Sequence, residues 1–116
     1  MILAVQGTNK FDEYAIFLRA MGTALHGMKE DDKEIIIYSA GPRRINGMAF
    51  EFANISERSL KGRGIRIKVQ KVPPSWLENN LYEIDYFAFF SRPKEPVSKL
   101  VELAEAKDLE VGVYRY

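Results

Sequence analysis

Five short apolar runs, separated by segments with helical periodicity, constrain the fold of this chain more than any other feature. The runs predict strands at residues 2–6, 35–39, 65–69, 84–90 and 109–114. Strands that alternate with helices form parallel sheets with helices on both faces, joined by right-handed crossovers. We therefore predict one α/β domain over residues 1–116, a Rossmann-like three-layer sandwich. Its five-stranded, mainly parallel sheet should have the strand order 3-2-1-4-5.

Turn residues predict where the helices begin. Asp12 is the expected N-cap of the first helix, and Pro42 and Pro96 suit the first turns of two later helices. Residues 72–76 should form a rigid loop, followed by a short helix at 77–81. The expected buried stripe of the first helix consists of Tyr14, Phe17, Leu18, Met21, Leu25 and Met28. The expected inner face of the second helix consists of Ile45, Met48, Ala49, Phe52, Ala53 and Leu60.

Aromatic residues gather around the fourth predicted strand. We interpret them as core, because aromatic side chains bury large areas under the helices. The residues are Tyr82, Tyr86, Phe87, Phe89 and Phe90. Trp76 follows the Pro73-Pro74 pair, which should hold it near the surface, and two interpretations stay open for it: a core residue, or a wall on which a base stacks.

Composition excludes several classes of function. Without cysteine, the chain has no disulfide, zinc–thiolate site or thiol nucleophile. Seventeen basic and sixteen acidic residues give a net charge of +1, which argues against nucleic acid as a partner. The N-terminus lacks a signal-peptide pattern and no apolar run has membrane-spanning length, so we expect a cytoplasmic protein without a membrane partner.

The densest basic cluster has two interpretations. It consists of Lys61, Arg63, Arg66, Lys68 and Lys71. We favour a charged helix end and an edge strand protected by charge over a nucleic-acid patch.

Three predicted turns should converge on a binding crevice. In such sheets, ligands bind beyond the carboxyl ends of the strands where the strand order reverses, here between the first and fourth strands. A strand that turns into a helix also presents free N–H groups to an anion, and arginine forks suit phosphate oxygens. The candidate ligand-binding residues are Gly7, Thr8, Asn9, Ser39, Gly41, Arg43, Arg44, Asn46, Ser91 and Arg92.

The sequence offers no catalytic machinery at this crevice. His26, the single histidine, falls at the far end of the first helix, and Glu51 and Glu57 fall on outer faces of the second helix. No acid–base pair, phosphate-binding loop or serine-nucleophile motif is present. We assign no catalytic residue, no metal ligand and no cofactor, and favour a binding function over an enzyme.

The turn motifs resemble those of the SLOG superfamily of Rossmann-like domains, which includes LOG phosphoribohydrolases, DprA-type proteins and YspA-like proteins. The similar segments are Gly7–Tyr14 after the first strand, Ile36–Asn46 around the second, and Val72–Trp76 after the third. The chain is also similar to small proteins of tailed phages. The resemblance implies a nucleotide or nucleotide-derived ligand. A phage-encoded member would act in the host cytoplasm as a sensor or sequestering protein.

The chain departs from these relatives at two motifs. Ser39–Asn46 replaces their glycine-rich turn, and Ser91–Glu95 stands where the LOG signature P-G-G-x-G-T-x-x-E would fall. Phosphoribohydrolase activity is therefore not carried over.

Two alternatives to a non-catalytic nucleotide-binding module remain. The first is a small nucleotide hydrolase or transferase, and the second is a protein-interaction module that acts on a host protein. Single-stranded DNA binding by analogy with DprA is less favoured. Pairing through an edge strand makes a homodimer a further partner hypothesis.

Overall fold

The computed structural model describes residues 1–115 and contains one five-stranded sheet. The strands are β1 (Ile2–Gly7), β2 (Glu34–Ser39), β3 (Arg66–Lys71), β4 (Tyr86–Ser91) and β5 (Glu110–Arg115). The helices are α1 (Tyr14–Leu25), α2 (Arg43–Gly62), α3 (Pro74–Asn79) and α4 (Lys99–Ala106), with a 3-10 helix at Leu81–Glu83. The spatial order is β3-β2-β1-β4-β5 and every neighbouring pair is parallel. The predicted fold class and strand order are confirmed.

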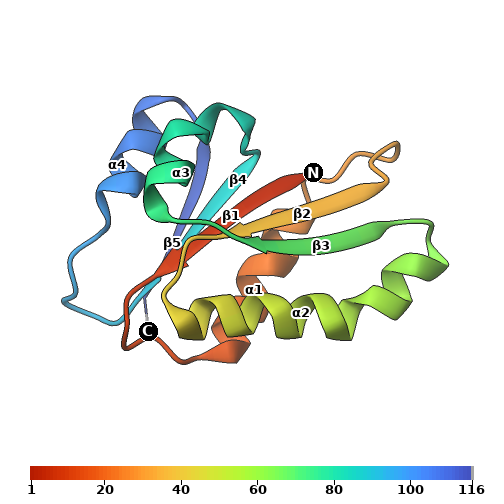
Figure 1. Ribbon diagram of the computed structural model, residues 1–116, viewed down its shortest axis with the longest axis horizontal. Helices are drawn as coiled ribbons and strands as arrows, with labels where there is room; N and C mark the ends of the chain where they lie inside the picture. The colour runs from red at the N-terminus through yellow and green to blue at the C-terminus, as the bar shows by residue number, and fades with distance from the viewer. Residues whose placement is uncertain (116) are drawn as a thin grey trace.

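Helices cover the sheet on both faces. Figure 1 shows α1 and α2 on one face and α3 and α4 on the other, which gives the three layers. The chain changes face after β3, so the strand order reverses between β1 and β4. β3 is the predicted edge strand: Ile67 and Val69 pack against the core, while Arg66 and Lys68 are exposed.

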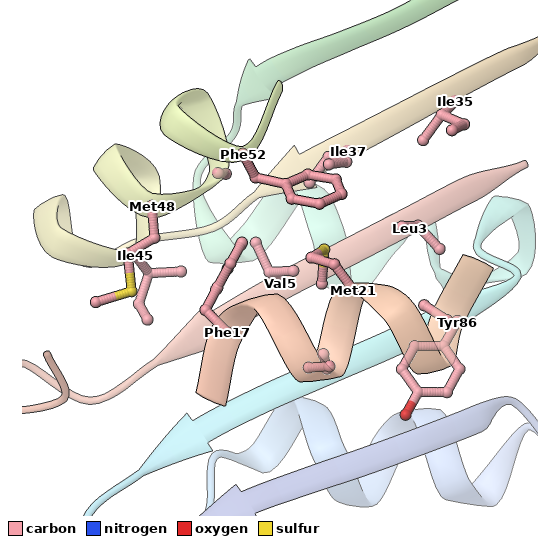
Figure 2. Packing of buried hydrophobic residues seen from close by; sticks show 14 of the residues in the cluster. Leu3, Val5, Phe17, Met21, Ile35, Ile37, Ile45, Met48, Phe52 and Tyr86 are labelled. Atoms are coloured by element: carbon pink, nitrogen blue, oxygen red, sulfur yellow. The ribbon is translucent and has the colours of Figure 1, made fainter. Parts of the chain in front are cut away.

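The core has two parts, one on each face of the sheet. In Figure 2, Phe17 and Met21 of α1 and Phe52 of α2 point toward Val5 and Ile37 of the central strands. The second part lies on the other face and contains Ala4, Leu77, Phe87, Phe89 and Leu100. Each fully buried large side chain contributes about 1.5–3 kcal/mol. This two-sided burial holds the ends of β1 and β4 in a fixed relation.

The amphipathic helix α2 is the longest helix and matches its predicted inner face closely. Ile45, Met48, Ala49, Phe52 and Leu60 are buried, and Ala53 is half-buried. Among the described residues, no helix combines the length and apolar character needed to cross a membrane.

The start and stripe of α1 differ from the prediction. The N-cap is Glu13, and Asp12 instead forms an ion pair with Arg44 at 3.0 Å. Leu18 is 41% exposed, because it lies at the margin of the buried face. Met28 lies beyond the end of the helix at Leu25, although it still packs against the core.

The segment before β4 also differs from the prediction. α3 begins at Pro74 inside the predicted loop 72–76, since proline is tolerated at the first helical position. The helix predicted at 77–81 is therefore displaced toward the N-terminus. Tyr82 is 76% exposed and does not belong to the aromatic core, whereas the other four aromatic residues of that cluster are buried.

The last helix begins later than Pro96 predicts. Ser98 is the N-cap of α4, and its hydroxyl accepts a hydrogen bond from the Leu100 N–H at 3.2 Å. Pro96 therefore lies in the loop of residues 92–98, which follows β4 at the carboxyl edge of the sheet.

Candidate functional site

The three predicted turns meet at the carboxyl edge of the sheet. The Gly7 N–H donates to the Gly41 carbonyl at 3.0 Å, and the Thr8 N–H donates to the Phe90 carbonyl at 2.9 Å. These bonds join the turn after β1 to the turn after β2 and to the end of β4. The first part of the site prediction, that these turns lie together, is confirmed.

Gly7 allows this close approach. A Cβ at this position would lie 2.8 Å from the Ile45 Cδ1 atom and 2.8 Å from the Phe90 carbonyl oxygen. Because real Cβ atoms do not come so close to backbone, only glycine fits between the three turns.

Asn46 organises the turn between β2 and α2. Its Oδ1 atom accepts hydrogen bonds from the Ser39 hydroxyl at 2.5 Å and from the Gly41 N–H at 3.1 Å. Gly41 has a positive φ of 82°, a conformation that favours glycine. Ser39 and Asn46 therefore shape the turn before α2, and their side chains are already hydrogen-bonded to each other.

The N-terminus of α2 is a feature of the edge that could hold an anion. Pro42 is its N-cap, and in the part of the chain that the structure describes no side chain caps it and no acidic residue lies in its first turn. The first N–H groups of a helix have no acceptor within the helix and carry the positive end of its dipole. Arg43 and Arg44 are exposed beside them, with Arg44 held by Asp12.

A carboxylate that the sequence prediction did not include links the loops after β1 and β4. The Glu95 Oε1 atom accepts hydrogen bonds from the Thr8 hydroxyl at 2.6 Å and from the Arg92 N–H at 2.7 Å. These bonds, together with the nearby charges of Lys10 and Arg92, lower the pKa of the Glu95 carboxyl below its ordinary value. The signal that could have revealed Glu95 is its position three residues after Arg92, which suits a side chain that closes a turn.

Two buried polar atoms near the carboxyl ends of β1 and β4 have no hydrogen-bond partner among the described residues. They are the Ser91 Oγ, in a residue that is 0% exposed, and the Gln6 Oε1. Gln6 pairs with Phe89 in the β1–β4 register, so Gln6 and Ser91 lie two positions apart on the same face of neighbouring strands. Buried polar groups without a partner are uncommon in folded proteins. Gln6 was missing from the prediction because a polar residue inside a strand gives no distinct signal.

Trp76 lies against the end of β2. Its ring packs on Tyr38 with centroids 4.5 Å apart, and it is half-buried. Tyr38 directly precedes Ser39, so part of an aromatic surface borders the candidate site. Trp76 also packs partly against the core on this face of the sheet, and the stacking wall stays a prediction.

Two hollows lie away from this edge, at the amino ends of β2 and β3. One has a volume of about 370 Å³ and is lined by Lys61, Arg66, Lys68 and neighbouring residues. The other has a volume of about 280 Å³ and is lined by Lys29, Arg63 and neighbouring residues. The larger hollow lies between the last turns of α2 and the edge strand β3, and Glu34 and Glu57 also line it. An anion bound by N–H groups and arginines needs no deep hollow.

The other residues considered in the sequence analysis lie in different parts of the molecule. Asn9 and Arg92 are exposed in the loops after β1 and β4. His26 is the exposed C-cap residue of α1, and Glu51 and Glu57 are exposed on α2. Residues 1–115 contain no group of three His, Cys, Asp or Glu side chains that could hold a metal ion.

Comparisons of the chain with protein-family models, with curated proteins and with solved structures find no match.

Proposed function

We propose that this protein binds a nucleotide or nucleotide-derived anion at the carboxyl edge of its sheet, without converting it. One observation carries this proposal: the N-terminus of α2 is uncapped and has the exposed Arg43 guanidinium beside it. Free N–H groups and a helix dipole favour a phosphate group, and an arginine can add a bidentate contact.

Groups next to this anion site suit the uncharged parts of a nucleotide. The Ser91 Oγ and Gln6 Oε1 atoms are buried and unpartnered, so a ligand would gain hydrogen bonds from them only by displacing the groups that cover them. The half-buried Trp76 ring offers a face to a base. A plain inorganic anion would use none of these groups, so together they favour a nucleotide-type ligand.

The resemblance of the turn motifs to the SLOG superfamily supports the same ligand class. A phage-encoded member of that superfamily would sense or sequester a host signalling nucleotide. The described residues at the edge include no free pair of carboxylates for acid–base work, because Asp12 pairs with Arg44 and Glu95 is held by Thr8 and Arg92. This supports binding over catalysis.

Calorimetry against mono-, di-, cyclic and ADP-ribose-type nucleotides tests the proposal. We expect Arg43→Ala to weaken binding about tenfold, because it removes a charge-assisted contact. Arg63→Ala is the matched control, since Arg63 is exposed at the opposite end of the same helix and should leave affinity unchanged.

Two results would count against the proposal. Absence of binding up to millimolar concentrations of every nucleotide would exclude it. Equal losses in Arg43→Ala and Arg63→Ala would place the site elsewhere. Recovery of intact nucleotide after long incubation is expected, and its conversion would favour the enzyme alternative.

A further inference from the structure

Glu95 occupies donors that the site would otherwise offer to a ligand. Its Oε1 atom accepts from the Thr8 hydroxyl on the β1 side and from the Arg92 N–H on the β4 side. Thr8 and Arg92 are both candidate ligand-binding residues. The two loops that face each other across the switch point are thus connected by a carboxylate of the chain itself.

The surroundings of Glu95 are those of a bound anion. The positive charges of Lys10 and Arg92 stabilise its ionised form. The Arg115 guanidinium donates to the Glu95 carbonyl at 3.2 Å and ties this part of the loop to β5. A carboxylate placed between a hydroxyl, an N–H group and two cations has the environment that proteins provide for phosphate oxygens.

We propose that Glu95 is a built-in competitor for the anionic group of the ligand, and that binding releases its carboxylate from Thr8 and Arg92. This inference rests on the proposed function and describes how anion binding at that site is regulated. A phosphate oxygen can replace the Glu95 Oε1 atom because it accepts the same two hydrogen bonds. The released carboxylate then turns to solvent, and the incoming phosphate takes over the positive charges of Lys10 and Arg92.

Substitution of Glu95 separates competition from a purely structural role. Glu95→Gln removes the charge and keeps the size of the side chain, and Glu95→Ala removes the acceptor as well. Glu102→Gln is the control, because Glu102 is an exposed carboxylate in the first turn of α4. Calorimetry with inorganic phosphate and with adenosine 5′-monophosphate, at constant ionic strength, gives the affinity of each protein.

We expect Glu95→Ala to bind these probes about tenfold more tightly than the wild type, because the Thr8 hydroxyl and the Arg92 N–H become free. Glu95→Gln should also bind more tightly than the wild type, because a neutral amide oxygen is a weaker competitor for these donors than a carboxylate. The Glu102→Gln protein should bind as the wild type does. The melting temperature of each variant, measured alongside, shows whether the loop contact also stabilises the fold.

The outcomes distinguish this inference from the proposed function. If the wild type binds measurably and both Glu95 variants bind equally or more weakly, Glu95 is not a competitor, and the proposed binding function is unaffected. A lowered melting temperature without tighter binding shows a structural role only, and also overturns the competitor. If no protein of the series binds either probe at millimolar concentration, the proposed function fails and the competitor fails with it.

Discussion

At the scale of single residues, Gly7 is the tightest point of the candidate site. Its N–H binds the Gly41 carbonyl, and its Cα faces Ile45 of α2 and the backbone of Phe90. No side chain fits there unless the three turns move apart. The close approach of β1, α2 and β4 at this edge therefore depends on the absence of a side chain at Gly7.

We predict that Gly7→Ala lowers the free energy of unfolding by roughly 1–3 kcal/mol, because the new Cβ would overlap backbone and core atoms. The matched control is Gly47→Ala within α2, where a Cβ would meet nothing within 4 Å. That substitution should raise stability by about 0.5–1 kcal/mol, since alanine favours a helix interior more than glycine does. Urea denaturation of the three proteins checks both values. Equal effects of the two substitutions would contradict the close approach at Gly7.

At the scale of elements, β4 and β5 are joined by more than their ladder of hydrogen bonds. The Tyr86 and Tyr114 hydroxyls share a hydrogen bond of 2.6 Å on the α1 and α2 side of the sheet. Burial, this hydrogen bond and the charge of Glu110 raise the pKa of Tyr86 above its ordinary value of 10.0. The fold thus favours the protonated phenol of Tyr86.

The raised pKa of Tyr86 predicts a loss of stability at alkaline pH. Its contribution is fully present below the unfolded pKa near 10 and falls as the pH rises above it, because the folded state resists deprotonation. Denaturation between pH 8 and pH 11.5 should show a smaller alkaline loss for Tyr86→Phe than for the wild type. Tyr82→Phe should behave as the wild type does, since Tyr82 is 76% exposed. Identical slopes for all three proteins would contradict the account of this tyrosine pair.

The elements also show what a sequence can and cannot predict here. Hydrophobic periodicity predicted every strand and the inner face of α2, because burial controls both. The turn residues did not distinguish Ser98 from Pro96 as the start of α4, since both residue types suit a helix start. Asp12 was predicted as a helix cap, but its carboxylate pairs with Arg44, which is distant in sequence. Long-range partners of this kind have no local signal.

The same limit explains the partial prediction of the site. Parallel strands bring their carboxyl ends to one edge, so the meeting of the three turns follows from the topology. The pairing of Glu95 with Thr8 joins residues 87 positions apart and depends on how the loop 92–98 folds. Gln6 and Ser91 became candidates only when their burial without partners was visible.

At the scale of the whole molecule, the strand order reverses once, between β1 and β4. The chain leaves β1 toward the face covered by α1 and α2 and leaves β4 toward the face covered by α3 and α4, and the loops after both strands lie at one edge of the sheet (Figure 1). The two hollows lie at the opposite ends of the strands, near the basic cluster. We therefore expect the anion to bind at the carboxyl edge of the sheet and not in either hollow.

Titration of the isotope-labelled protein with adenosine 5′-monophosphate, followed by backbone amide resonances, tests this position most directly. We expect the largest shifts at Thr8, Arg43 and Arg92, with little change at Ile65 and Lys68 beside the larger hollow. Shifts centred on Ile65 and Lys68, or no shifts at millimolar nucleotide, would contradict the account.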